Sequence, residues 1–460
     1  MKSIKKSVLY IIFLSSTLKC FSFTFENLLK MVVESNPEIN SALITYKTNV
    51  LSSKNLDGAY VPNVSVSAST KLAKEYNWNA LPNYFSSNIT FFQPLPGGAT
   101  ISLETSYTFN TSDSEKVKFI SQNPQISFNF SQSLLPFWIQ GKIQDPLRLS
   151  LKQQEKYFYY QYLFTKKKVL QNFLQNYLYM LISKNEISMY KNSIELYEEQ
   201  IKSLTELKLL GNTTLDKIIE IENSKWNVQQ SLMTSQTNYE GYIQNLKILC
   251  GQNFENSFID SCNTENLKDT VLEFCDIEED PLEETYKIKL EILQAERILE
   301  RQNSAPTINF SIQPNWTLET TKQDEWKKAW ENMGSPSSWN VSIGINLSPL
   351  FLGLAKENKK KYELNYEDTK NSYNSYMLQK KSLKQQYTTL LNYYLLQKNT
   401  ISSLYEAGLK ELDDYKYQYA VNTISKLDLY SVNTRIENCR LTKENIELFV
   451  LLYEILLIIN

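Results

Sequence analysis

The chain has 460 residues, with 48 Lys and Arg against 50 Asp and Glu, so its formal charge is −2. A chain this close to neutrality has no global basic field, which argues against a nucleic-acid partner. It contains 30 Tyr but no His, and this excludes a two-histidine zinc centre, a Ser-His triad and an imidazole general base.

The N-terminus has the layout of a secretory signal peptide. Lysines precede the apolar run Val8–Leu14, and small residues follow it. We therefore predict a signal peptide over residues 1–22, with a buried helix or a retained anchor as the alternatives. Lipidation of Cys20 stays open, because Lys19 stands where a lipid-attachment motif has a small residue.

After this segment, two halves of the chain repeat one order of elements. Each half has a short amphipathic helix, an alternating strand, a polar loop, a second alternating strand and two very long helices. We predict a first repeat over residues 23–250, a linker over 251–280 and a second repeat over 281–460. The short amphipathic helices are expected over Phe25 to Asn55 and Pro281 to Ser304.

The predicted strands alternate apolar residues with small, uncharged polar ones. The shared strands are Val61–Thr70, Pro124–Phe137, Ala305–Trp316 and Trp339–Phe351. An additional alternating pair, Ser86 to Asn110, has Pro-Gly-Gly at its centre and predicts a hairpin in the first half. The chain would then supply four or six strands.

Such strands, flanked by aromatic residues, are typical of a transmembrane β-barrel. A soluble sandwich with one wet face is the alternative. Closed membrane barrels need at least about eight strands, and an open edge in lipid leaves backbone groups unpaired. We therefore predict a homo-oligomer in which each subunit gives part of one wall, in contact with lipid.

The long helices follow the strands as two pairs, Pro146 to Leu210 with Thr213 to Cys250, and Ala355 to Tyr419 with Thr423 to Ile459. The first helix of each pair, at some 65 residues, would be roughly 95–100 Å long. Apolar and Tyr residues recur at alternating steps of three and four from Tyr362 to Gly408. This period predicts left-handed coiled-coil packing, and the Tyr-rich seam suits partly wet packing.

Four cysteines follow the signal segment, and none belongs to a CxxC pair: Cys250, Cys262, Cys275 and Cys439. In an exported chain Cys262 and Cys275 would close a loop, or all four would be free or mixed thiols. Both alternatives stay open.

Together these features resemble the TolC-like outer-membrane efflux protein family over nearly the whole mature chain. The resemblance rests on SNPEINSA, SQSLLPFWIQGK, NLSPLFLG and the helix breaks LLGNTTLDKIIEIENS and YAVNTISKLDLYSVNTR. It implies a mixed fold in which a trimer shares one membrane β-barrel, twelve-stranded in the family. The β-barrel would be in contact with outer-membrane lipid, and the long helices would continue as a coiled-coil barrel through the periplasm.

The resemblance also implies functional residues at the two helix breaks. A periplasmic adaptor would contact the tip residues Leu210, Gly211, Asn212, Val421, Asn422 and Thr423. Asp428 matches the first of two carboxylates that ring the periplasmic aperture in the family, and Ser431 stands at the second. Asp216 lies in a similar place in the first repeat. A helix N-terminal carboxylate favoured by the dipole explains Asp428 equally well.

The expected function is that of a passive duct. No P-loop, dinucleotide-binding, zinc-protease or nucleophile-elbow motif occurs, so we predict no enzyme activity, cofactor or metal site. The chain would be the outer-membrane exit of a tripartite efflux or type I secretion system. Its partners would be a periplasmic adaptor (membrane fusion) protein and an inner-membrane pump of the resistance-nodulation-division, ABC or a similar class. An envelope-associated structural coiled-coil protein without channel activity is the alternative, and the exported substrate stays open.

Overall fold

The computed structural model describes residues 25–54, 60–71, 84–114, 117–251, 267–274, 279–320, 331, 334–347 and 355–459. They form two compact units, which we call the helical unit and the sheet unit. The helical unit holds the described residues of 1–44, 160–282 and 374–460, and the sheet unit those of 45–159 and 283–373. The predicted signal peptide, Cys20, Cys262 and Cys275 lie outside the described residues.

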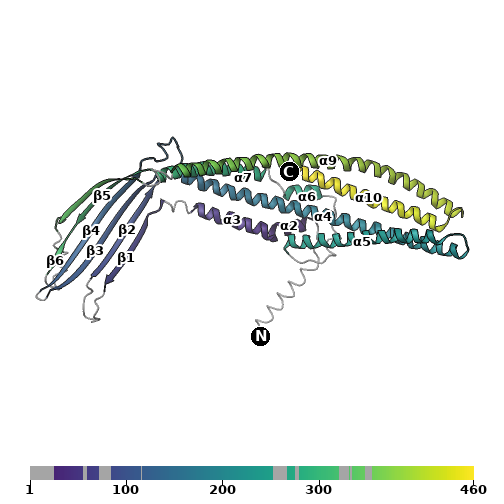
Figure 1. Ribbon diagram of the computed structural model, residues 1–460, viewed down its shortest axis with the longest axis horizontal. Helices are drawn as coiled ribbons and strands as arrows, with labels where there is room; N and C mark the ends of the chain where they lie inside the picture. Colours follow the sequence, from purple (N-terminus) through teal and green to yellow (C-terminus); the bar gives the residue numbers. More distant parts are fainter. Residues whose placement is uncertain are drawn as a thin grey trace, which may run out of the picture. The chain divides into compact units, whose positions relative to one another are not determined.

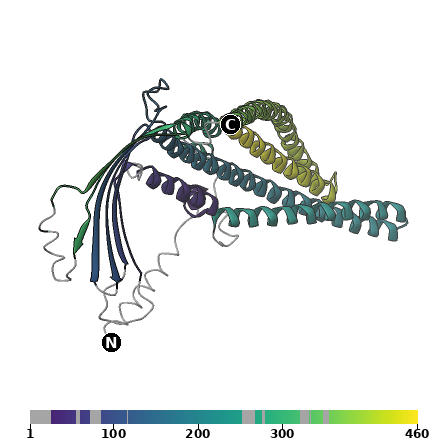
Figure 2. The same cartoon turned by 60° about the vertical axis from the view of Figure 1, so that its left-hand side comes forward.

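The sheet unit contains one antiparallel sheet (Figures 1 and 2). Its strands are β1 (Asn63–Lys71), β2 (Tyr84–Leu95), β3 (Ala99–Ser114), β4 (Val117–Ser133), β5 (Thr307–Asn315), β6 (Leu318–Thr320) and β7 (Ser338–Asn346). The spatial order is β1-β2-β3-β4-β5-β7, and the short β6 pairs with β4. Six full strands therefore lie side by side, which resolves the choice between four and six.

Strand β6 continues β5 along the same edge of β4. Gln125 is opposite Asn315 and Gln122 is opposite Leu318, so the register does not change between the two strands. The hydrogen-bond ladder of β4 lacks one donor at Pro124, which has no N–H. The Pro124 carbonyl still accepts from the Trp316 N–H at 3.1 Å.

The predicted hairpin is confirmed and is longer than expected. Leu95 lies opposite Ala99, so the loop is Pro-Gly-Gly. Gly97 and Gly98 have φ values of +86° and +76°, which glycine adopts without steric cost. At Gly97 a Cβ would also lie 2.1 Å from the Trp138 ring. This close approach fixes the hairpin turn against the segment that follows β4.

The two faces of the sheet differ as predicted. Through the pairing register one apolar row crosses six strands: Val64, Phe91, Leu103, Phe128, Ile312 and Val341. Much of this face is open in the single chain, with Val66 and Ile343 71% and 74% exposed. The opposite face carries cross-strand polar bonds, such as Asn129 Nδ2 to Ser102 Oγ at 3.3 Å.

The helices are α2 (Phe25–Ser35), α3 (Pro37–Lys54), α4 (Pro146–Leu209), α5 (Leu215–Cys250), α6 (Leu267–Phe274), α7 (Pro281–Ser304), α9 (Ala355–Ala420) and α10 (Lys426–Ile459) (Figure 1). The four long helices match the sequence prediction within three residues at each end. None of the described helices is both long enough and apolar enough to cross a membrane.

One prediction about the first helix was wrong. The segment from Phe25 to Asn55 is two helices, because Asn36 stops α2 and caps α3. The Asn36 Oδ1 accepts the N–H groups of Glu38 and Ile39 at 2.9 and 3.2 Å, and Pro37 occupies the first helical position, where it needs no donor. Helices α4 and α7 begin in the same way, with Asp145–Pro146 and Asp280–Pro281.

The core of the helical unit is built from α2, the start of α3, α4, α5, α6 and α10. Its fully buried side chains include Phe173, Tyr177, Leu246 and Ile455. Part of the segment predicted as the linker over 251–280 contributes to this core, because α6 buries Leu267 and Val271 there. The amphipathic spacing of α6 explains this burial, since a two-turn helix can bury one apolar side.

The Tyr-rich seam of α9 is partly packed and partly open. In the helical unit Tyr394 stacks on Phe449 and Tyr453 of α10, at centroid distances of 4.6 and 5.7 Å. Leu383 and Leu404 of the same register are 42% and 58% exposed in the single chain. How far this seam is packed in the assembled protein stays a prediction.

Two of the four cysteines beyond the signal segment lie within the described residues, and both are free thiols. Burial raises the pKa of the Cys250 thiol to about 12, so this thiol stays protonated and behaves as an apolar core group.

Candidate functional site

The first candidate turn joins α4 to α5 at Leu210, Gly211 and Asn212. The Gly211 N–H donates to the Lys208 carbonyl at 3.0 Å, and the Asn212 N–H donates to the Leu207 carbonyl at 2.9 Å. These two bonds form a Schellman motif, in which the helix ends with a left-handed residue. Gly211 is that residue, with φ +76°, and a Cβ at this position would have no atom within 4 Å.

The second turn joins α9 to α10 and has the same geometry. The Asn422 N–H donates to the Tyr419 carbonyl at 3.0 Å, and the Thr423 N–H donates to the Gln418 carbonyl at 2.9 Å. Asn422 has φ +59° and is the one non-glycine residue with positive φ among those described. Asparagine tolerates this conformation better than most residues, which explains why it stands where glycine is usual.

The two turns therefore match residue by residue. Leu210, Gly211 and Asn212 correspond to Val421, Asn422 and Thr423, and both turns lie in the helical unit at the right-hand end of Figure 1. Leu210 and Val421 are 73% and 49% exposed. Leu209, which the sequence pattern does not single out, is 85% exposed, so each turn presents apolar side chains to solvent.

Asp428 belongs to a capping box at the start of α10. Its carboxylate accepts the Ser425 hydroxyl and N–H at 2.6 and 3.0 Å, and the Ser425 Oγ accepts the Asp428 N–H at 3.2 Å. These side-chain and backbone hydrogen bonds from Ser425 lower the pKa of Asp428. The group is exposed and charged at neutral pH, and it has a structural task.

Asp216 does not occupy the equivalent position. The matched turns put Leu215 opposite Lys426 as the first residue of each helix. Asp216 is then the second residue of α5, whereas Asp428 is the third of α10. The cap of α5, Thr214, makes no side-chain cap bond, so the two aspartates have different surroundings although both lie in a first turn.

Comparison with known proteins identifies the fold. No family model and no curated protein matches the chain. The Campylobacter jejuni CmeC outer-membrane channel has a TM-score of 0.61 at 15% identity, over 94% of this chain and 84% of CmeC. The open state of the Neisseria gonorrhoeae MtrE outer-membrane channel gives 0.58 at 12%, over 93% and 88%. The chain has the TolC-like channel fold.

The outer-membrane protein VceC of Vibrio cholerae has the same TolC-like fold, with a TM-score of 0.57 at 13% identity over 94% of this chain and 95% of VceC. The resemblance read from the sequence is thus confirmed at the level of the fold. The proteins in these structures are described as channels or outer-membrane proteins and not as enzymes. In the described part of this TolC-like chain, no cluster of three or more acidic, Cys or His side chains could hold a metal ion.

Proposed function

We propose that the chain is one subunit of a homotrimeric outer-membrane channel with a long periplasmic extension. The channel conducts substrates passively from a periplasmic adaptor and an inner-membrane pump to the outside. The system is a tripartite efflux or type I secretion machine. Residues 23–250 and 281–460 are its two structural repeats, joined by 251–280.

One observation carries this proposal, namely the exposed apolar face of the sheet. Val66, Ile343 and Ile345 are 65–74% exposed in the single chain, and soluble proteins rarely expose a contiguous apolar face that crosses a whole sheet. Contact with the acyl chains of lipid would remove this apolar face from water. The polar face, with bonds such as Gln313 to Gln125 at 3.1 Å, would line a water-filled lumen.

Of the six full strands, the two end strands β1 and β7 have a neighbour on one side only among the described residues. Open edges are costly in lipid because their N–H and C=O groups find no partner. In a trimer, β7 of one subunit closes on β1 of the next, and six strands from each of three subunits give eighteen. Barrels of about 16–18 strands enclose an aqueous channel. With eighteen strands this barrel would be wider than the twelve-stranded barrel that the resemblance implies.

The matched turns are the proposed adaptor contact. Their exposed apolar side chains, Leu210 and Val421, suit a protein partner better than bulk water. Changing both to Ser is expected to weaken adaptor binding without loss of the fold, because neither side chain is buried. Pull-down with the purified adaptor measures this. Unchanged binding would remove the turns from the interface.

For the aperture we propose Asp428 and Asp216. Asp428→Asn keeps an acceptor for Ser425 but removes a negative charge, so the cation preference of the channel should fall if the carboxylate lines the path. Asp216→Asn removes the corresponding charge in the first repeat, where Asp216 is the second residue of its helix and Asp428 is the third of its own. Reversal potentials in a salt gradient measure both. An unchanged potential in both variants would place the constriction elsewhere.

The alternative is a structural coiled-coil protein of the envelope. Membrane fractionation separates the two ideas. The channel must stay in the outer membrane after salt and alkaline washes, need detergent for extraction and have the mass of three chains of 53.7 kDa or slightly less after signal removal. A monomer released without detergent would contradict the proposal.

A further inference from the structure

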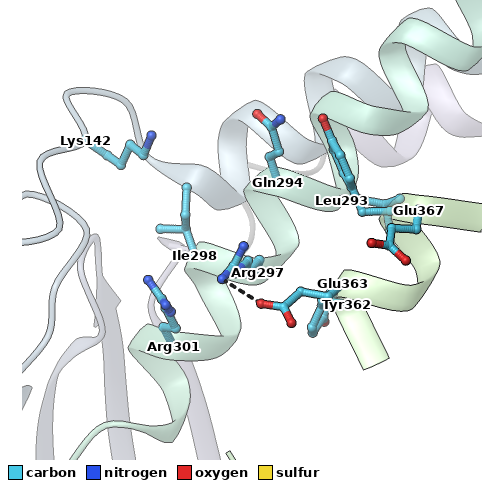
Figure 3. Close-up of a pocket in the computed structure, with 10 residues that line it drawn as sticks. Lys142, Leu293, Gln294, Arg297, Ile298, Arg301, Tyr362, Glu363 and Glu367 are labelled. Carbon is cyan, nitrogen blue, oxygen red and sulfur yellow. Dashed lines mark ion pairs between the residues drawn. The ribbon is translucent and has the colours of Figure 1, made fainter. Parts of the chain in front are cut away.

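A pocket in the sheet unit lies outside the turns and the apolar sheet face (Figure 3). Its volume is about 470 Å³, within the roughly 300–1,000 Å³ typical of small-ligand sites. It is lined by α7, the start of α9 and the segment after β4, through Lys142, Leu293, Gln294, Arg297, Ile298, Arg301, Tyr362, Glu363, Tyr366 and Glu367.

The charges of the pocket are separated. Figure 3 shows Lys142 and Arg301 on one side and Glu367 on the other, with the Arg297–Glu363 ion pair between them at 3.5 Å. In the part of the chain that the structure describes, no ion pair engages Lys142, Arg301 or Glu367. The pocket therefore has a positive end and a negative end whose exposed charges form no ion pair among the described residues.

Arg297 adds an unmet donor. Its Nε is shielded from solvent, yet among the described residues it has no hydrogen-bond partner. Buried donors in native proteins are nearly always paired, and an exception calls for an explanation such as an absent ligand. An anionic oxygen in the pocket would satisfy this N–H.

The order of the charges relative to the sheet is also informative. Arg301 lies in the last turn of α7, shortly before β5 begins at Thr307. Glu367 lies three turns into α9, which follows β7. Thr307 at the start of β5 pairs with Asn346 at the end of β7, so α7 and α9 adjoin the same end of these two strands. The positive end of the pocket is therefore nearer the strands than the negative end. Leu293 and Ile298 supply apolar wall.

We propose that this pocket binds the zwitterionic headgroup of a phosphatidylethanolamine-type lipid at the inner face of the outer membrane, a site that rests on the channel function proposed above. The phosphate oxygens accept from Arg297, Arg301 and Lys142. The ammonium group donates to Glu367. This orientation keeps the phosphate nearer the membrane and the amine farther from it, as in a lipid leaflet.

The test measures binding of short-chain lipids to the purified full-length protein in detergent by native mass spectrometry. Phosphatidylethanolamine is expected to bind more tightly than phosphatidylglycerol, which lacks the amine. Soluble glycerophosphoethanolamine should bind more weakly than the lipid, because it has no acyl chains for the apolar wall. Equal binding of the soluble ester would reassign the site to a free metabolite and overturn the lipid proposal.

Two variants and two controls make the test specific. Arg301→Gln should weaken the binding of both lipids by about tenfold, the loss expected for one charge-assisted hydrogen bond. Glu367→Gln should weaken the binding of phosphatidylethanolamine by a similar factor and leave the binding of phosphatidylglycerol unchanged. Lys289→Gln on α7 and Asp368→Asn on α9 change an exposed charge outside the pocket and should have no effect.

The proposal is overturned if the variants bind like the controls, or if wild type does not prefer phosphatidylethanolamine. Conductance of the same preparations separates the two proposals. If the protein conducts but shows no lipid preference, only the lipid-site proposal is overturned. If it binds the lipid as expected but never conducts, only the channel proposal is overturned.

Discussion

At the residue scale, two positions show how the same backbone requirement is met by different side chains. Gly211 and Asn422 both end a long helix in the left-handed region, with φ +76° and +59°. The conformation, and not crowding, selects these residues, because nothing lies within 4 Å of a Cβ built at Gly211. Substitution therefore tests backbone strain alone.

Gly211→Ala is expected to destabilise the helical unit by about 1 kcal/mol, the cost of left-handed backbone for an L-residue, whereas Asn422→Gly should be neutral or mildly stabilising. Gly241→Ala is the control, because Gly241 lies inside α5 with open space around it and alanine there should stabilise by about 0.5–1 kcal/mol. Thermal melting in detergent measures all three. Equal shifts for the two alanine variants would contradict the assignment.

Asp280 predicts a pH dependence. Burial alone would raise its pKa, but the hydrogen bonds from Lys380 and Tyr376 outweigh burial, so the pKa of Asp280 is lowered. A depressed carboxyl pKa stabilises the fold above the unfolded value of about 3.9, and this stability is lost as the pH falls through the folded value.

Asp280→Asn should therefore lower the melting temperature at pH 7, by an amount that corresponds to about 1–3 kcal/mol. The gap between wild type and variant should narrow as the pH falls below about 4. The gap between the two melting curves across pH is the readout. A gap that is constant down to pH 3 would show that the carboxylate charge plays no part.

At the scale of elements, asparagine pairs join the long helices across large sequence distances. Asn185 Nδ2 donates to Asn445 Oδ1 at 2.8 Å between α4 and α10, and Asn245 Nδ2 donates to Asn176 Oδ1 at 3.0 Å between α5 and α4. Paired, partly buried amides favour one register, because a slip of one turn separates the two amides. We infer that they hold the helices of each subunit in phase.

Asn445→Ala should lower the free energy of unfolding by about 1–3 kcal/mol, because it leaves the Asn185 amide without its partner. Replacing both Asn185 and Asn445 by Ala should cost less than the sum of the two single Ala changes, because the shared hydrogen bond is lost only once. A double-mutant cycle with chemical denaturation measures the coupling. Additive effects of the two single changes would indicate that the amide pair contributes no interaction energy of its own.

Much of this fold can be predicted from the sequence, since the strands alternate with period two and the long helices keep one seam. The ends of the elements are harder to predict. Pro124 has the pattern of a strand start, but β4 begins at Val117 and runs through it, because the Pro124 carbonyl still takes part in the hydrogen-bond ladder. The break at Asn36 escapes the pattern although Asn-Pro is a start signal, since the apolar spacing continues across it.

The candidate residues are predictable to different degrees. The turns at Gly211 and Asn422 follow from local chemistry. The offset of Asp216 from Asp428 needs the hydrogen bonds of both turns. Contacts between distant segments, such as Asn185 with Asn445, 260 positions apart, leave no local signal. The same holds for the pocket, where Lys142, Arg301 and Glu367 come from three segments.

At the scale of the whole molecule, the two faces of the sheet should respond in opposite ways to the same substitution. Ile343→Lys puts a charge on the proposed lipid face, which costs about 2–4 kcal/mol near the bilayer midplane, so the amount of assembled protein in the outer membrane should fall. Ser342→Lys, its neighbour on β7, should assemble normally and shift ion preference toward anions. Membrane fractionation and reversal potentials report the two outcomes. Similar losses for both would mean that the apolar face does not meet lipid.

The central claim is that the chain assembles into a water-filled pore, and single-channel recording tests it most directly. Detergent-purified protein of trimer mass is added to a planar lipid bilayer under an applied voltage. We expect discrete current steps of uniform size, and reversal potentials that shift in Asp428→Asn. Folded, trimeric protein that inserts into the bilayer and passes no current would contradict the account.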